Sequence, residues 1–142
     1  MDNCINVTLP AISRNEALAR SIVAFFAVEL DPTIDELGDI KTAVSEAVTN
    51  CIVHGYPGEK KGDIRIYARI SGEVLHIEIS DSGVGIADID EARKPFFTTS
   101  EGEERSGMGF TIMETFMDSL DVENLEQGGL KVTMEKSLRR NI

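Results

Sequence analysis

The feature that most constrains the fold is a change in the spacing of apolar residues at Gly62. After a short predicted strand over residues 5–9, apolar residues recur every three or four positions, as in amphipathic helices. Beyond Gly62 they alternate over residues 64–79 and again over residues 120–134, with a glycine-containing turn inside each stretch and a predicted helix over residues 110–117 between them. Helices followed by hairpins predict an α+β fold, with the helices on one face of a largely antiparallel sheet.

Two helices are predicted before Gly62. The first begins where residues 13–16 have the spacing of a capping box, and it ends near Leu30. The second has Asp31 as its predicted cap and Pro32 as its first helical residue, and it ends near His54. The predicted buried stripes are Leu18, Ile22, Phe25 and Phe26 in the first helix and Leu37, Ile40, Val44, Ala47 and Cys51 in the second.

The composition points to one acidic domain. A chain of 142 residues is long enough for an ordinary core, and we expect one domain over residues 1–142. The formal charge of −11 disfavours binding to nucleic acid or to an anionic membrane, because both need a cationic surface. Cys4 and Cys51 are too few for a secreted disulfide scaffold, and no apolar run reaches the length of a membrane span. We therefore expect a cytoplasmic protein.

The second predicted helix carries the first candidate site. Glu46 and Asn50 are four residues apart, so their side chains fall on one side of the helix and can contact one ligand. His54 continues the row. The residues around them are mostly apolar, which argues that the helix is buried and that these polar groups have a function. A solvated polar stripe is the alternative interpretation.

A second candidate site follows the first hairpin. Asp81 has the same parity as the apolar residues of the strand before it, so its carboxylate is expected to face the core. There it needs a hydrogen-bond donor, such as the exocyclic amine of a nucleobase. Gly83 and Gly85 allow the main chain to approach a ligand closely. The alternative is an aspartate that accepts hydrogen bonds from the N–H groups of its own turn.

A third candidate site precedes the helix predicted over residues 110–117. The segment Arg105-Ser106-Gly107-Met108-Gly109 leads into this helix, whose N-terminus suits a phosphate group. A plain capping turn is the alternative. Residues 95–105 have the hydroxyl groups expected of a lid over phosphates, although a disordered acidic loop would have a similar composition. The P-loop and G-x-G-x-x-G patterns are absent, which disfavours P-loop and Rossmann sites.

In combination, the three segments resemble the GHKL ATPase family. Glu46-x-x-x-Asn50, Asp81-x-Gly83-x-Gly85 and Gly107-x-Gly109 have the order and spacing of its N, G1 and G2 boxes. The resemblance implies the Bergerat ATP-binding fold, a two-layer α/β sandwich in which helices cover one face of a mixed, mostly antiparallel sheet. It also implies a mobile ATP lid over about residues 94–106.

A narrower likeness is to the anti-sigma factor kinases, above all those of the sporulation sigma factor, sigma-F. It rests on residues 45–50, 54–56, 97–99 and 104–114. The likeness implies a sigma-F-like sigma factor that the protein holds inactive, an anti-anti-sigma factor phosphorylated on serine, and a homodimer. Arg20 lies opposite the predicted stripe of the first helix, so we expect it to be exposed and able to contact an acidic partner residue.

The resemblance assigns a role to each candidate residue. Glu46 would be the general base that takes a proton from a serine hydroxyl group. Asn50 would bind Mg²⁺, and Asp81 would bind the adenine amino group of ATP or ADP. The other nucleotide contacts would come from Gly83, Gly85, Thr98, Thr99, Arg105, Ser106, Gly107, Met108 and Gly109. Relatives often have a lysine where Ser100 stands, so Arg105 is the main cation near the phosphates and Lys94 a distant second.

Three alternative functions remain open at this point. The protein could be an anti-sigma kinase of a stress-response sigma system. It could be the ATP-binding module of a sensor histidine kinase, which is ordinarily joined to a helical segment that carries the phosphorylated histidine. It could also be an interaction protein with a degenerate site, although the presence of Glu46, Asn50 and Asp81 speaks against that.

Overall fold

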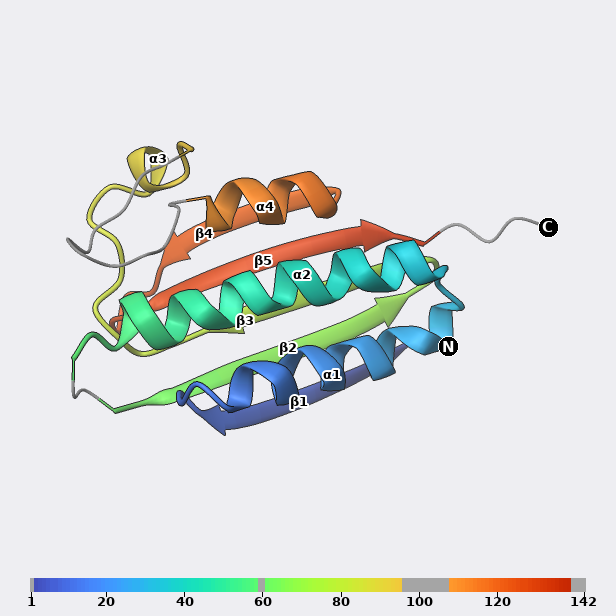
Figure 1. The fold of residues 1–142 in the computed structure, drawn as a ribbon, viewed down its shortest axis with the longest axis horizontal. Helices are drawn as coiled ribbons and strands as arrows, with labels where there is room; N and C mark the ends of the chain where they lie inside the picture. Colours follow the sequence, from blue (N-terminus) through green and yellow to red (C-terminus); the bar gives the residue numbers. More distant parts are fainter. Residues whose placement is uncertain (1, 59–60, 96–107, 139–142) are drawn as a thin grey trace.

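A computed structural model describes residues 2–58, 61–95 and 108–138. Its five-stranded sheet has the order β1-β2-β3-β5-β4. The strands are β1 (Asn3–Pro10), β2 (Asp63–Ser71), β3 (Val74–Ser80), β4 (Ser119–Asn124) and β5 (Leu130–Ser137). The helices α1 (Asn15–Ala27), α2 (Ile34–Asn50) and α4 (Gly109–Phe116) lie across one face, and the short α3 (Ile89–Ala92) lies at one end (Figure 1). The predicted α+β, two-layer architecture is confirmed.

Every strand pairing in the described part of the chain is antiparallel, so the expected mixed sheet is wrong in that detail. The reason lies in the connections. Two helices of opposite direction separate β1 from β2, so the chain returns antiparallel to β1 (Figure 1). Tight turns join β2 to β3 and β4 to β5, and a hairpin is antiparallel by construction.

The two predicted hairpins are confirmed. Alternate residues of β2 and β3 are buried against the helices, and Ala68 pairs with Ile77 at the centre of the ladder. Gly72 takes a positive φ of 61° in the turn between these strands, a conformation that costs glycine little. The core contains the aliphatic side chains of this face together with those of α2 and α4, including Ile40, Met113 and Met134.

The predicted buried stripe of α1 is wrong for Leu18 and Phe25, whereas Ile22 and Phe26 are half-buried and Phe26 packs against the core. The helix is buried through Ala19, Val23, Ala24 and Ala27, whereas Leu18 is 46% exposed and Phe25 is 82% exposed. Small side chains let the helix backbone approach α2 and the sheet closely, and this contact selects the face. The larger side chains of Leu18 and Phe25 are left outside.

The helix starts also differ from the prediction in their caps. Helix α1 begins at Asn15, but Ser13 makes no side-chain cap and instead accepts a hydrogen bond from Glu16 through its main-chain oxygen. Asp31 does not cap α2, because it has a left-handed φ of 55° and ends the 3₁₀ turn η1 (Val28–Leu30). Thr33 is the cap.

Thr33 and Glu36 form a reciprocal capping box at the start of α2. The hydroxyl of Thr33 accepts from Glu36 N at 3.1 Å, and Glu36 Oε1 accepts from Thr33 N at 2.8 Å. The predicted core stripe of the helix is confirmed for Ile40, Val44, Ala47 and Cys51, and Leu37 is half-buried. The rod continues beyond Asn50 as a π-helical turn, η2 (Cys51–Gly55), so its predicted end near His54 is confirmed.

We expect Thr33→Ala to lower the free energy of unfolding by about 1 kcal/mol, because the main-chain N–H of Glu36 loses its hydroxyl acceptor. Urea denaturation followed by circular dichroism measures this loss. The matched control is Ser13→Ala at the predicted cap of α1, for which we expect a change within about 0.5 kcal/mol. Equal losses in the two variants would contradict the capping assignment.

Candidate functional site

Three chain segments that carry candidate residues meet at one end of the molecule. The C-terminal end of α2, the C-terminal end of β3 and the N-terminal end of α4 all lie on the side where α3 is drawn in Figure 1. Asn50 ends α2, Asp81 follows β3, and Gly109 begins α4. The fold thus brings the first candidate segment, the start of the second and the end of the third to a common edge.

Glu46 and Asn50 lie against the first residue of α4. A Cβ atom placed on Gly109 would be 3.3 Å from Glu46 Oε2 and 3.3 Å from Asn50 Nδ2. Both side chains are half-buried. The predicted carboxylate and carboxamide therefore share one neighbour, and this neighbour is a helix N-terminus, where unpaired N–H groups favour an anion.

Asp81 is only 2% exposed, and its carboxylate is held by main-chain donors from two segments. Oδ1 accepts from Gly83 N at 2.9 Å and, more weakly, from Leu130 N at 3.3 Å. The predicted inward orientation is confirmed. The alternative interpretation, in which the aspartate accepts a hydrogen bond from an N–H group of its own turn, holds for Oδ1, because Gly83 N donates to it.

The second carboxylate oxygen of Asp81 faces η2. A Cβ atom on Gly55 would lie 2.8 Å from Oδ2, so the main chain of η2 approaches the carboxylate as closely as glycine permits. Burial, followed by the charge of the nearby Asp81 carboxylate and hydrogen bonding to it, raises the pKa of the Cys51 thiol well above its usual value. Isolated π turns are frequent at functional sites.

The loop after Asp81 packs tightly against protein atoms. A Cβ atom on Gly83 would be 1.9 Å from the Gly55 oxygen, and Val84 N donates to that oxygen at 3.0 Å. Gly85 has a φ of +70°, and its Cβ direction points at the side chain of Asn124. This packing requires glycine at both positions independently of any ligand.

The remaining predicted residues either fall outside the described part of the chain or have contacts of their own. Thr98, Thr99, Arg105, Ser106, Gly107 and most of the predicted lid fall outside the described residues. Met108 is the N-cap of α4 and accepts from Ile112 N through its main-chain oxygen. Lys94 bonds to Glu91, and this bond raises its pKa. Arg20 lies on α1, where it pairs with Glu16 and keeps 39% of its side chain exposed.

Two side chains that the motifs do not single out also support the loop. The hydroxyl of Tyr56 accepts from Ser82 N at 2.6 Å and donates to the Asp63 oxygen at 2.9 Å. Arg65 donates to the main-chain oxygen of Asp81 at 3.1 Å and to Ser82 Oγ at 2.8 Å. Tyr56 stands in the His54-Gly55-Tyr56 triplet, but the sequence gives no sign of its long-range partners.

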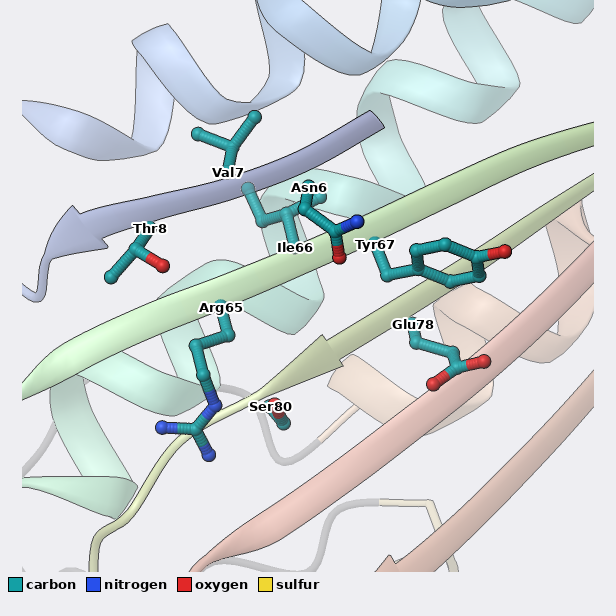
Figure 2. A pocket seen from close by; sticks show the side chains of 8 residues that line it. All are labelled: Asn6, Val7, Thr8, Arg65, Ile66, Tyr67, Glu78 and Ser80. Carbon is teal, nitrogen blue, oxygen red and sulfur yellow. The ribbon is translucent and has the colours of Figure 1, made fainter. Parts of the chain in front are cut away.

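Arg65 also lines a groove on the sheet face opposite the helices. Figure 2 shows Asn6, Thr8, Tyr67, Glu78 and Ser80 around it. The groove encloses about 230 Å³, below the 300–1,000 Å³ typical of small-molecule sites. Glu78 pairs there with His76 and Lys131. Since its charged groups are already engaged, this groove is a weaker candidate site than the helix-end cluster.

Among the described residues, no group of three or more His, Cys, Asp or Glu side chains is arranged to hold a metal ion. A cation at Asn50 would therefore need ligands from a bound molecule, as Mg²⁺ commonly does with phosphates. In the same part of the chain, no helix has both the length and the apolar character needed to cross a membrane.

The raised pKa of Cys51 predicts different reactivities for the two cysteines. Cys4 is exposed, whereas Cys51 is buried and stays a neutral thiol, the unreactive form. At pH 8 we expect iodoacetamide to modify one thiol per native chain, and two in urea, as counted by intact mass spectrometry. Cys4→Ala should abolish the native labelling and Cys51→Ala should leave it unchanged. Rapid labelling of Cys51 in the native protein would contradict the described burial.

Comparison with known proteins identifies the family. Residues 9–136 match the model of the histidine kinase-like ATPase domain. An anti-sigma F factor of Thermoanaerobacter sp. (strain X514) is 55% identical over 134 residues, which cover 94% of this chain and 93% of the relative. An anti-sigma F factor of Bacillus licheniformis is 47% identical over 141 residues, which cover 99% of this chain and 97% of the relative.

Solved structures support the same fold. The structure of the RsbU and RsbW domains of Rv1364c from Mycobacterium tuberculosis has a TM-score of 0.67 at 18% identity, covering 96% of this chain and 32% of that one. The catalytic domain of the histidine kinase ThkA has a TM-score of 0.59 at 18% identity, covering 94% and 96%. At these identities the likeness concerns the fold alone. The family match and the close relatives together show that this chain belongs to the histidine kinase-like ATPases and, among them, to the anti-sigma F factors.

Proposed function

We propose that this protein binds and inhibits a sigma-F-type sigma factor and, as an ATP-dependent serine kinase, phosphorylates its anti-anti-sigma partner. The observation that carries the kinase part is the meeting of Glu46 and Asn50 at the first residue of α4, Gly109. A carboxylate, a carboxamide and a helix N-terminus at one point suit a proton acceptor, a cation ligand and a phosphate site. The names of the close relatives support the sigma-factor part.

Adenine would bind at the Asp81 carboxylate. Hydrogen bonds from Gly83 and Leu130 fix its orientation, so its remaining acceptor capacity can meet the exocyclic amine of the base. The phosphates would then extend along Gly107-Met108-Gly109 to the N-terminus of α4. We assign Thr98, Thr99, Arg105 and Ser106 to the lid contacts, with Arg105 as the principal cation.

The donor set at Asn50 fits Mg²⁺ bound mainly through phosphates. An amide oxygen is a suitable ligand for this ion, which usually keeps few protein ligands and several waters. When bound, Mg²⁺ supplies charge neutralisation for the transferred phosphoryl group. Gly109 leaves room beside Asn50, because any side chain there would crowd the carboxamide.

Glu46 acts as the general base in this proposal. The substrate serine oxygen forms a bond to the γ-phosphorus, the bond between that phosphorus and the β,γ-bridging oxygen breaks, and ADP leaves. The hydroxyl proton passes to a Glu46 carboxylate oxygen. The half-buried position of Glu46 on the rigid rod of α2 holds this acceptor in place.

The exposed side of α1 is our proposed partner surface. Leu18 and Phe25 expose large apolar areas there, and Arg20 adds a positive charge on another side of the same helix, because two residues along a helix turn the side chain by about 200°. A surface of this kind suits a protein partner, which would be the sigma factor, the anti-anti-sigma factor or a second copy of the chain in a homodimer. All three, and a cytoplasmic location, belong to the proposal.

Glu46→Gln tests the proposed base. The amide keeps the shape of the side chain but cannot accept the proton, so affinity for Mg²⁺ and ATP should stay within about threefold while phosphate transfer falls about 10²- to 10⁴-fold. Calorimetry measures binding, and mass spectrometry of the anti-anti-sigma partner measures transfer and locates the phosphate on serine.

The matched control for Glu46→Gln is Asp35→Asn, an exposed acid in the first turn of the same helix, which should leave both quantities unchanged. Full transfer by Glu46→Gln would contradict the assignment of the base. An acid-labile phosphohistidine in place of an acid-stable phosphoserine would contradict the proposed substrate class.

Arg20→Ala tests the partner surface. Among the described contacts Arg20 pairs with Glu16 of its own helix, in a part-buried i,i+4 pair, so its loss should cost about 1 kcal/mol of stability or less. We expect at least about tenfold weaker binding to the sigma factor or to the anti-anti-sigma factor, measured by fluorescence anisotropy at constant salt. Arg14→Ala, at the exposed start of the same helix, is the control. Unchanged affinity for both partners would remove Arg20 from the interface.

A further inference from the structure

The segment Asp81–Ile86, here called the glycine loop, is held at both ends by one hairpin. At its start, Asp81 N donates to the Leu130 oxygen at 3.0 Å, and Leu130 N donates back to the Asp81 carboxylate. At its end, Ile86 is bound by Asn124, the last residue of β4. The hairpin of β4 and β5 therefore holds both ends of the glycine loop by hydrogen bonds.

Asn124 binds both main-chain groups of a single residue. Its Oδ1 accepts from Ile86 N at 2.9 Å, and its Nδ2 donates to the Ile86 oxygen at 2.6 Å. A side-chain amide used in this way imitates a strand partner, because it offers one acceptor and one donor side by side. An aspartate has no donor for the Ile86 oxygen, and an alanine has neither group.

Gly85, the residue before Ile86, packs closely against the same Asn124 side chain. Gly85 has a φ of +70°, and a Cβ atom there would lie 2.6 Å from Asn124 Oδ1. Glycine also has more conformational freedom than any other residue, so the loop needs an external constraint at this point. The Gly55 oxygen constrains Val84, and Asn124 constrains Gly85 and Ile86.

We propose that Asn124 is a positioning residue for the nucleotide base, acting through Ile86 and Gly85. The inference rests on the proposed function, in which the glycine loop borders adenine. Among the described residues, Asn124 hydrogen-bonds to Ile86 and not to Met108 or Gly109 of the phosphate segment, and it binds the end of the loop opposite Asp81. Its loss should therefore weaken the contribution of the base to binding and leave the contribution of the phosphates unchanged.

Direct binding measurements with three probes test this role. Calorimetry on wild-type protein, Asn124→Ala and the control Gln127→Ala is carried out with ATP, GTP and inorganic tripolyphosphate, each with Mg²⁺. Gln127 is exposed in the turn of the same hairpin. For Asn124→Ala we expect about tenfold weaker ATP binding, a smaller ATP-to-GTP affinity ratio and tripolyphosphate affinity within about twofold of wild type. Gln127→Ala should match wild type with all three probes.

Kinetics with the anti-anti-sigma substrate add a second readout. Asn124→Ala should raise the KM for ATP about tenfold and leave kcat nearly unchanged, because Glu46 and the phosphate segment keep their places. Circular dichroism checks that each variant is folded. If the alanine variant does not fold, Asn124→Asp replaces it, since aspartate keeps the acceptor for Ile86 N and loses only the donor.

The outcomes separate the two hypotheses. Wild-type ATP affinity in a folded Asn124 variant would overturn the positioning role, and so would an equal loss of affinity for ATP and tripolyphosphate. Failure of the wild-type protein to bind ATP would instead overturn the proposed function. Weaker ATP binding with unchanged tripolyphosphate binding supports both.

Discussion

The buried carboxylate of Asp81 is the constraint on which the candidate site depends. A charge removed from water needs donors, and in this protein they come from the glycine loop and from the start of β5, while the main chain of η2 packs against the other carboxylate oxygen. These segments are far apart in the sequence. Their meeting at one carboxylate fixes where β3 ends and how closely η2 approaches it, and no residue larger than glycine fits at position 55.

The parts of the fold that follow from the sequence are those with strong alternation or a long apolar stripe. β2 and β3 carry isoleucine or leucine at most of their inward positions, and α2 has a continuous stripe from Ile40 to Cys51, so both could be predicted. Helix α1 could not be predicted correctly. Hydrophobicity favours burial of Leu18 and Phe25, but close packing against α2 favours the alanine face. The buried face of α1 is set by how closely this helix approaches α2, and no local sequence pattern contains that distance.

The candidate site divides in the same way. Glu46, Asn50 and Asp81 could be selected from spacing, parity and family resemblance, because each signal is local. The supporting contacts of Tyr56, Arg65 and Asn124 could not, since their partners lie 26, 16 and 38 residues away. The π turn could not be predicted either, because the apolar stripe continues through it. Its role is visible only in the structure, where it brings Gly55 against Asp81.

The dependence of Asp81 on the last hairpin sets an order for biosynthesis. Asp81 and the glycine loop leave the ribosome well before Leu130 and Asn124, the residues that hold both ends of that loop. A nascent chain that ends at α4 therefore lacks part of the hydrogen bonding that its buried carboxylate needs. The region around Asp81 takes its mature form only when translation is almost finished, so the N-terminal elements emerge first and the candidate site is completed last.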